Sequence, residues 1–309
     1  MHLDRRDFLK KGFAVGAAFS LADLSGLFAA EPAPAAAGRA PHLVAVRNGT
    51  RIDMLNAAIA ALGGMKAFVK PGQTVVIKPN IGWDVVPELG ANTHPDIVRR
   101  LVELCDEAGA KEISVFDNTC DAWQRAYAHS GIEKALEGTR AKLINGKDES
   151  MYRVVTVAKA TKLLDVKVHS LILDSDVYIN APVLKHHSGA TMTCAMKNAM
   201  GVVWDRRYWH KNDLHQCIAE FQTFKKPALN IVDAYHPMMR NGPRGTNASD
   251  VVEMKCLIAS TDPVAADAAA AKLLGHQPAD IRYIPIAATL GLGSMDLDKM
   301  NIQRLQLSV

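Results

Sequence analysis

Short apolar runs alternate with longer amphipathic stretches from residue 42 onward. The runs have the length of strands and the amphipathic stretches the length of helices, a rhythm typical of β-α-β units. Such units build a mainly parallel sheet with helices packed against it. We therefore predict an α/β fold, doubly wound and Rossmann-like, with a mainly parallel sheet flanked by helices. The predicted strands cover residues 43–47, 74–78, 112–117, 142–145, 176–180, 228–233 and 255–260.

Apolar stripes at helical spacing predict four helices, over residues 52–69, 95–108, 212–224 and 263–274. Two of them begin at His94-Pro95 and Asp262-Pro263, because the first turn of a helix tolerates proline.

One segment breaks the alternation of strand and helix. Two short runs rich in β-branched residues within 151–168 predict a small hairpin insertion. No linker rich in Pro, Gly or Ser divides the chain after residue 40. We therefore expect a single α/β domain over residues 42–309, with an irregular lobe around 182–250; two domains are the alternative.

The N-terminal residues do not follow this pattern. Asp4-Arg5-Arg6-Asp7-Phe8-Leu9-Lys10 precedes an apolar stretch rich in Ala and Gly, the arrangement of a twin-arginine signal peptide. A membrane anchor is the alternative, but Asp23 leaves fewer than about 18 uncharged apolar residues on either side. We expect residues 1–31 to be a cleaved signal peptide and 32–41 a flexible lead-in. The twin-arginine translocase would then be a transient partner, and the mature protein would be periplasmic without a stable membrane span.

The chain of 309 residues is 49% hydrophobic, which suffices for a large core, and its net charge is only +4. The positive charge is concentrated locally. Residues 182–226 hold seven Lys and Arg against three Asp and Glu, and four of the eleven histidines. Lysine attracts phosphate or carboxylate, and a neutral imidazole can act as a base or a metal ligand, so this segment favours an anion or a metal site. A solvated basic loop is the alternative.

Aromatic residues interleave with these charges at Trp204, Tyr208 and Trp209. Such an arrangement can stack nucleic-acid bases. The patch is short and the protein is expected to be exported, so we expect no nucleic-acid partner. The aromatic side chains are expected to pack a lid or to line a pocket for a small ligand.

Common cofactor motifs are missing from the chain. The five cysteines are scattered without a C-x-x-C pair, so we expect no iron–sulfur cluster and no four-cysteine zinc site. No phosphate-binding loop or dinucleotide fingerprint occurs. The adjacent His186 and His187 diverge on a regular strand or helix, so a metal would need ligands from separate loops. The cofactor is therefore unknown, with a metal possible.

Polar residues recur where the predicted strands end, as in Lys78-Pro79-Asn80 and Asp117-Asn118-Thr119. Ligands of open α/β sheets bind beyond the carboxyl ends of the strands. Lysines can supply positive charge there, asparagines directional hydrogen bonds, and histidines proton transfer or metal ligation. The candidate catalytic residues are Lys185, His187 and Lys197, and the candidate cofactor-binding residues are Lys78, Asn80, His94, His186 and Asn198.

Five motifs together resemble the domain-of-unknown-function 362 family: Val76-Ile77-Lys78-Pro79-Asn80, Thr93-His94-Pro95, Ala181 to His187, Thr193 to Gly201 and Ser260 to Asp267. The resemblance covers most of the chain after residue 42 and implies a fold and a candidate site more than a reaction. Many similar proteins carry a ferredoxin module that this chain lacks, so the resemblance implies no electron transfer.

A shorter likeness concerns residues 182–201, where His187 and Lys197 are ten apart in a basic, Gly-bearing segment. This segment is similar to the one by which nickel-pincer lactate racemases hold their cofactor through His and Lys.

These observations together predict an exported protein that binds a small anionic ligand or cofactor at its strand ends. If it is an enzyme, Lys and His suit proton transfer next to a carboxylate or carbonyl, as in an isomerase. The alternative is a non-catalytic periplasmic accessory protein that binds a metal or ligand for a partner.

Overall fold

The computed structural model describes residues 27–28 and 41–308. Across this part of the chain, ten strands form one mixed sheet, ordered β12-β1-β11-β10-β7-β2-β3-β4, with β8 added beside β10 and β9 beside β8. The strands are β1 (Leu43–Arg47), β2 (Thr74–Pro79), β3 (Glu112–Val115), β4 (Lys142–Leu143), β7 (Val177–Ala181), β8 (Val183–His187), β9 (Thr191–Thr193), β10 (Leu229–Met238), β11 (Cys256–Ser260) and β12 (Ile302–Gln306).

Most neighbouring strands of the sheet are parallel, which confirms the predicted α/β class. The parallel pairs include β10 with β7, β7 with β2, and β2 with β3. β11 runs antiparallel to both β1 and β10, and β9 is antiparallel to β8. The antiparallel strand β11 separates β1 and β12 from the parallel part of the sheet. The carboxyl ends of β2 and β3, in that parallel part, meet the candidate site.

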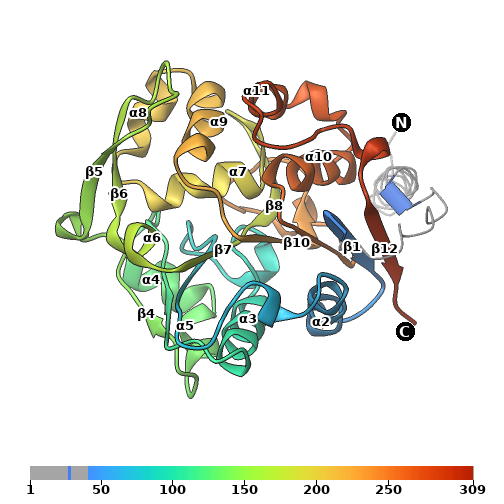
Figure 1. Cartoon of the computed structure of the whole chain (residues 1–309). Helices are drawn as coiled ribbons and strands as arrows, with labels where there is room; N and C mark the ends of the chain where they lie inside the picture. Colours follow the sequence, from blue (N-terminus) through green and yellow to red (C-terminus); the bar gives the residue numbers. More distant parts are fainter. Residues whose placement is uncertain (1–26, 29–40, 309) are drawn as a thin grey trace, which may run out of the picture.

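Helices cover both faces of the sheet (Figure 1). Helices on one face pack over β1, β2 and β11, and those on the other over β10 and β11. The first group is α2 (Arg51–Ala61), α3 (Pro95–Glu107), α4 (Trp123–His129) and α5 (Ile132–Leu136). The second group is α7 (Ala195–Asn198), α9 (Leu214–Phe224), α10 (Pro263–Leu273) and α11 (Tyr283–Thr289).

Strand β1 shows how the sequence builds two cores. Val44 and Val46 pack with the α2 and α3 layer, while Leu43 and Ala45 pack with the α10 layer. Alternate residues of a strand point to opposite faces, so a strand covered on both sides is apolar throughout. The continuous run from Leu43 to Val46 is therefore the mark of a fully buried strand.

The predicted helix starts are confirmed. His94 and Asp262 cap α3 and α10, each accepting a backbone N–H within the first turn through its side chain. The helix predicted over residues 52–69 is wrong in its extent. α2 ends at Ala61 because Gly63 and Gly64 adopt positive φ angles of 96° and 82°, which terminate a helix.

Smaller differences concern the remaining boundaries. β3 and β4 are shorter than the predicted strands over residues 112–117 and 142–145. The predicted helix over 212–224 begins at Leu214, because the side chain of Asp213 caps it. The C-terminal strand β12 was not predicted, since its five residues include only two apolar ones, three positions apart, and so lack the alternation that indicates a strand.

The predicted hairpin is present as a separate two-stranded antiparallel sheet of β5 (Tyr152–Thr156) and β6 (Asp165–His169). It is followed by α6 (Ser170–Asp174), and α8 (Arg206–Lys211) lies near it in Figure 1. Residues 182–250, predicted as an irregular lobe, contain β8, β9, β10 and three α-helices.

The twin-arginine motif at Arg5 and Arg6 lies outside the described residues. Two residues of the predicted signal peptide are described: Leu27 is buried, and its carbonyl accepts a hydrogen bond from Arg304 Nε at 2.7 Å. The guanidinium of Arg47 lies 4.8 Å from the centre of the Phe28 ring. Within residues 27–28 and 41–308, no helix combines the length and the apolar character needed to cross a membrane.

Candidate functional site

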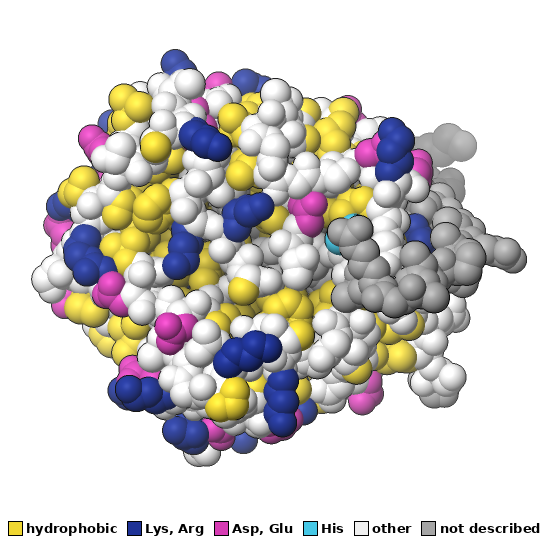
Figure 2. Space-filling model, viewed as in Figure 1, with side chains coloured by type: hydrophobic (Ala, Val, Ile, Leu, Met, Phe, Trp, Pro, Cys, Tyr) yellow, Lys and Arg dark blue, Asp and Glu magenta, His cyan; other side chains and the backbone are white. Residues whose placement is uncertain are grey.

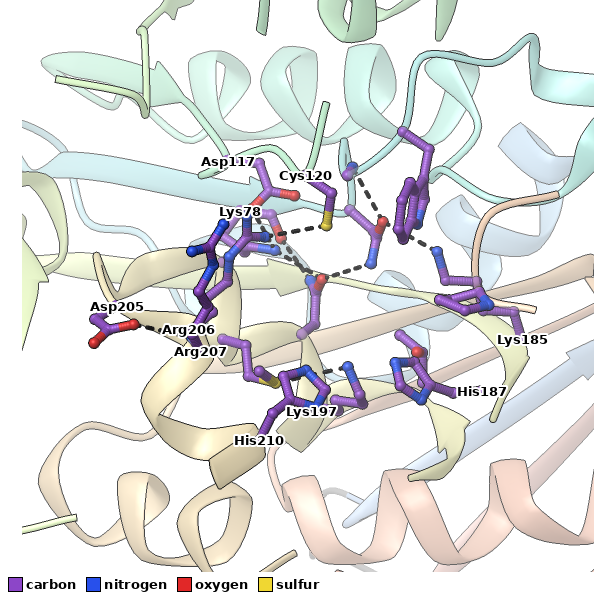
Figure 3. Close-up of a pocket in the computed structure, with 18 of the residues that line it drawn as sticks. Lys78, Asp117, Cys120, Lys185, His187, Lys197, Asp205, Arg206, Arg207 and His210 are labelled. Atoms are coloured by element: carbon purple, nitrogen blue, oxygen red, sulfur yellow. Dashed lines mark hydrogen bonds and ion pairs between the residues drawn. The ribbon is translucent and has the colours of Figure 1, made fainter. Parts of the chain in front are cut away.

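A cavity of about 800 Å³ lies where β2 and β3 end, bounded by β8, β9, α7 and α8 (Figure 3). Its walls carry six Lys and Arg side chains against two Asp. On the face shown in Figure 2, by contrast, Lys and Arg are scattered among Asp and Glu. The charged lining residues are Lys78, Lys147, Lys185, Lys197, Arg206, Arg207, Asp117 and Asp205.

Both acidic residues of the lining are already engaged. Asp117 Oδ1 pairs with Lys78 Nζ at 3.0 Å, and its Oδ2 accepts the backbone N–H of Ile81 at 2.7 Å. Asp205 accepts the N–H groups of Arg207 and Tyr208 and thereby caps α8. The remaining cations of the cavity therefore have no carboxylate of the lining to neutralise them.

Among the cations of the cavity lining, Lys78 is held by contacts within the protein. It is 1% exposed, and its Nζ donates to Asn198 Oδ1 at 2.7 Å as well as pairing with Asp117. Burial lowers the pKa of Lys78, and the negative charge of Asp117 acts against that shift. Because its charge is already paired, Lys78 serves mainly to position its neighbours and has no free ammonium to bind a ligand.

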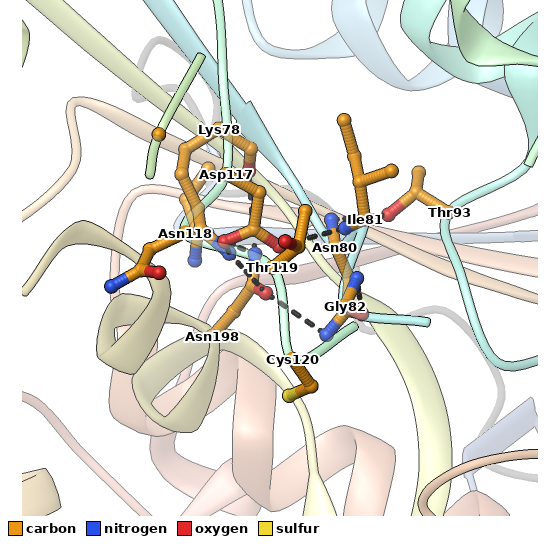
Figure 4. A network of polar contacts seen from close by, with 12 residues as sticks. Lys78, Asn80, Ile81, Gly82, Thr93, Asp117, Asn118, Thr119, Cys120 and Asn198 are labelled. Carbon is orange, nitrogen blue, oxygen red and sulfur yellow. Dashed lines mark hydrogen bonds and ion pairs between the residues drawn. The ribbon is translucent and has the colours of Figure 1, made fainter. Parts of the chain in front are cut away.

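Asn198 is the centre of a network of asparagine amides (Figure 4). Its Oδ1 also accepts from Asn80 Nδ2 at 3.2 Å, and its Nδ2 donates to Asn180 Oδ1 at 2.8 Å. Asn180 Nδ2 donates in turn to Asn230 Oδ1 at 2.9 Å. The network links β2, α7, β7 and β10, and it leaves the predicted ligand-binding residue Asn198 occupied within the protein.

Lys185, on β8, is 1% exposed and faces the cavity. Its Nζ donates to the carbonyl of Ala91 and, at 3.4 Å, to Asn80 Oδ1. Burial lowers the pKa of Lys185 to about 7, and the nearby charges of Lys197 and Lys78 add to the shift. This amine can therefore gain or lose a proton near neutral pH.

Lys197, on α7, is 9% exposed, and the one hydrogen-bond partner of its Nζ within the described part of the chain is Met200 Sδ at 3.6 Å. A thioether is a weak acceptor, so the ammonium lacks a strong partner. Burial lowers the pKa of Lys197 to about 8, with Arg206 and Lys78 contributing. Figure 3 shows Lys197 between the side chains of His187 and His210.

His187 faces the cavity, while its neighbour His186 points to the other side of β8, as predicted for adjacent residues of a strand. His187 Nδ1 accepts the N–H groups of Gly189 and Ala190 at 3.0 and 3.1 Å. Burial and the charge of Lys197 lower the pKa of His187 to about 2. The ring is therefore neutral, and its proton resides on Nε2 because Nδ1 is an acceptor.

Two of the predicted ligand-binding residues lie outside the cavity lining. His186 Nδ1 accepts the N–H of Gly242 at 3.1 Å. His94 caps α3 through its side chain, and its backbone N–H donates to Asp233 Oδ2 at 3.0 Å. His94 thus has the capping role that is the alternative for a polar residue at a strand end, while the ring of His186 fixes the backbone of a distant loop at Gly242.

Several lining residues are absent from the predicted set. Arg206, Arg207 and His210 belong to the basic segment 182–226, and α8 carries them to the mouth of the cavity. Cys120 is exposed, and Arg206 Nη1 lies 3.3 Å from its Sγ. Lys147 follows a strand of two residues and has no sequence signal of its own.

Helix α7, which carries Lys197 and Asn198, is held by a residue from the other end of the chain. Asp267 on α10 accepts the N–H groups of Ala195 and Met196 at 2.6 and 3.1 Å. Burial raises the pKa of Asp267 to about 7, although the two N–H groups favour its ionised form. Asp267 thus positions the site without contacting it.

Across residues 27–28 and 41–308, no group of three or more His, Cys, Asp or Glu is arranged to hold a metal ion. The side chains facing the cavity are instead mainly donors and cations. Such a lining suits an anion with several acceptor oxygens.

Comparison with known proteins shows which family the chain belongs to. The sequence profile described as "Domain of unknown function (DUF362)" matches residues 75–272. The chain belongs to this family. The DUF362 match includes five charged or titratable residues of the cavity lining: Lys78, Asp117, Lys185, His187 and Lys197.

A curated relative is the thylakoid-associated protein sll1697 of Synechocystis sp. (strain ATCC 27184 / PCC 6803 / Kazusa). This DUF362 chain is 28% identical to it over 252 residues, covering 79% of this chain and 76% of that protein.

Two solved structures are similar at low identity. The lactate racemase apoprotein of Thermoanaerobacterium thermosaccharolyticum matches with a TM-score of 0.46 and 9% identity over 71% of this chain. This chain spans only about half of the racemase, 54% of its length. A Thermotoga maritima protein matches with a TM-score of 0.46 and 12% identity, over 77% of this chain and 59% of that one.

Proposed function

We propose that this protein binds a small anionic ligand in the cavity at its strand ends, through ammonium and guanidinium groups. The observation that carries the proposal is the burial of Lys185 and Lys197 without a carboxylate partner in the described part of the chain. An unpaired buried charge is costly, and a bound anion removes that cost. A cavity of about 800 Å³ accepts an organic ligand as well as an inorganic ion.

We further propose that Lys185 can transfer a proton to or from a carbon next to a carboxylate or carbonyl. Its pKa of about 7 leaves a fraction of the amine neutral at physiological pH, as a general base requires. His187 enters the proposal as a hydrogen-bond donor, in place of the base expected from the sequence, because its Nδ1 is occupied by two backbone amides.

The twin-arginine motif supports export, and we propose that the mature protein acts in the periplasm. The description of the Synechocystis relative as thylakoid-associated is compatible with a protein that leaves the cytoplasm. Mass spectrometry of the protein recovered from fractionated cells of its source would give both the compartment and the first residue of the mature chain.

Binding is tested by thermal unfolding of the full chain with sulfate or malonate, against sodium chloride at equal ionic strength. An anion that binds the folded state at about 100 times its Kd stabilises it by about 2.7 kcal/mol. The Lys197→Met variant should lose most of this stabilisation. Lys142→Met, which removes an exposed lysine paired with Glu112, is the matched control and should keep it. Equal Tm in sulfate, malonate and chloride would refute the proposal.

Catalysis is separated from binding by Lys185→Arg, which keeps a positive charge that does not ionise at neutral pH. Incubation of lactate and malate with the protein in D₂O, followed by proton NMR, measures exchange of the hydrogen next to the carboxylate. Proton transfer by Lys185 is supported if the wild type exchanges this hydrogen and Lys185→Arg does not, while the variant still binds malonate. Binding without exchange in either protein favours the non-catalytic accessory function.

A further inference from the structure

Thr193 carries a hydroxyl that the fold leaves without a partner. Its side chain is 3% exposed, it lines the cavity, and Oγ1 has no hydrogen-bond partner among the described residues. A buried hydroxyl that lacks a partner destabilises the folded state, so such groups are rare in native proteins. A ligand oxygen in the cavity would supply the missing partner.

The register of β8 and β9 gives this hydroxyl its neighbours. Thr193 pairs with Lys185 and Thr191 with His187, so Thr193 lies one side-chain position from His187 on the cavity side of the hairpin. Cys194 then leads directly into α7, which places Lys197 four residues after Thr193. All three side chains line the same cavity, and Figure 3 shows Lys197 beside His187.

The three groups have complementary chemistry. His187 presents Nε2–H because its Nδ1 accepts two backbone amides. Lys197 presents an ammonium with only a thioether as its partner in the described chain. The hydroxyl of Thr193 can donate a third hydrogen bond, since no protein acceptor uses its proton. Donors without an acceptor select a deprotonated oxyanion over a neutral alcohol or amide.

We propose that Thr193, His187 and Lys197 form a subsite that holds one oxyanion group of the ligand, either a carboxylate or a phosphoryl or sulfo group. This subsite rests on the proposed anion binding and assigns the part of the cavity that recognises the charged group. Arg206, Arg207 and Lys147 lie at other points of the lining and remain available for the rest of the ligand. Thr193 thereby becomes a binding residue rather than a structural member of β9.

Thr193→Val tests the subsite because valine keeps the branched shape and removes the hydroxyl. We expect the Kd for sulfate, measured by calorimetry on the full chain, to rise about tenfold, the effect of losing a hydrogen bond to a charged group. The ligand-free Tm should stay equal or rise, because the variant no longer buries an unpaired hydroxyl. Thr193→Ser, which keeps the hydroxyl, should bind sulfate within about threefold of the wild type.

Tyr178→Phe is the matched control. Tyr178 Oη is also buried without a partner in the described chain, but Tyr178 does not line the cavity. Its removal should leave the Kd for sulfate within about twofold of the wild type. Repeating the titrations with malonate shows whether the planar or the tetrahedral oxyanion depends on Thr193.

The two proposals fail in different ways. If the wild type and Thr193→Val bind sulfate with the same Kd, the subsite is overturned and anion binding stays intact. A lower Tm of Thr193→Val at that unchanged Kd would give the hydroxyl a structural role only. A wild type that binds neither sulfate nor malonate overturns both. If Thr193→Val does not fold, Thr193→Ser and Thr193→Ala make the same comparison of a side chain with and without a hydroxyl.

Discussion

A methyl group on the Cα of Gly201 would lie 1.9 Å from Oδ1 of Asp117. The same methyl would lie 2.5 Å from Cε and Nζ of Lys78. The backbone of residues 199–202, which follows α7, therefore passes directly over the buried ion pair, and only a residue without a side chain fits there. The carbonyl of Gly201 also accepts the N–H of Asn118 at 2.9 Å, which fixes this approach.

Gly201→Ala should consequently destabilise the protein by about 2 to 4 kcal/mol, since either the ion pair or the backbone must move. Urea unfolding followed by circular dichroism measures the change. Gly189→Ala is the control, because its Cβ would meet only ordinary contacts of 3.5 Å or more, and it should change stability by about 0.5 kcal/mol or less. Equal stability of both variants would contradict the close approach.

The ion pair itself can be dissected by a double-mutant cycle. Asp117→Asn keeps an oxygen to accept the N–H of Ile81 but leaves Lys78 without its counter-charge, and should cost about 3 to 5 kcal/mol. Lys78→Met should cost a similar amount by leaving Asp117 unpaired. The double variant should be more stable than the sum predicts, with a coupling energy of about 1 to 3 kcal/mol. Additive losses in urea unfolding would show that the pair contributes no net attraction.

Much of the fold could be predicted from the sequence because it depends on local patterns. Alternating strand and helix lengths predicted the α/β class, and the rule that ligands bind at strand ends singled out Lys78 and Asn80, which the structure places in the lining of the cavity. Alternation along β8 explains why Lys185 and His187 share the cavity while His186 does not.

The remaining features of the site depend on contacts between distant segments. Asp267 holds α7 from a helix 71 residues away along the chain from Met196. The occupied Nδ1 of His187 depends on the turn that follows β8, and the unpaired hydroxyl of Thr193 on the packing around β9. No periodicity or motif in the sequence encodes these partners, so donor and acceptor roles could be assigned only from the structure.

Anion affinity should depend on pH through the two buried amines. Both pKa values are lowered, to about 7 for Lys185 and about 8 for Lys197, so the cavity loses positive charge as pH rises through this range. Sulfate, whose own charge is constant there, should bind at least tenfold more weakly at pH 9 than at pH 6. An anion favours the protonated amines, so binding near pH 8 should take up protons. Calorimetry in buffers of different ionisation enthalpy measures that uptake, and binding that is independent of pH would contradict the assignment.

The same shifts predict how the ligand-free protein responds to pH. Between pH 7 and about 10.5 the unfolded chain binds protons on these lysines that the folded protein has released. Stability therefore gains from these groups as pH rises through that window, and the gain is absent below pH 7, where both states are protonated. Lys185→Met should flatten this part of the curve in urea unfolding from pH 6 to 10. An unchanged slope would place the titrating group elsewhere.

Cys120 offers a direct measure of the charge of the cavity. It lines the cavity and is exposed, whereas Cys105, Cys194, Cys217 and Cys256 are buried. A positive cavity concentrates anions at its mouth and speeds their reactions about tenfold or more at low salt. Sulfonatoethyl methanethiosulfonate should therefore modify Cys120 faster than the trimethylammonioethyl reagent, relative to the ratio of their rates with free cysteine.

Mass spectrometry of peptides containing Cys120 follows these rates, and Cys120→Ala removes the fast phase. Arg206→Gln should reduce the preference for the anionic reagent, because its guanidinium lies 3.3 Å from the sulfur. Sulfate should protect the thiol only if it occupies the same cavity, and raising the salt concentration should weaken the preference through screening. If the ratio of the rates of the anionic and cationic reagents equals the ratio for free cysteine, the charges of the lining do not act on the interior of the cavity. That result would remove the electrostatic basis of the proposed ligand binding.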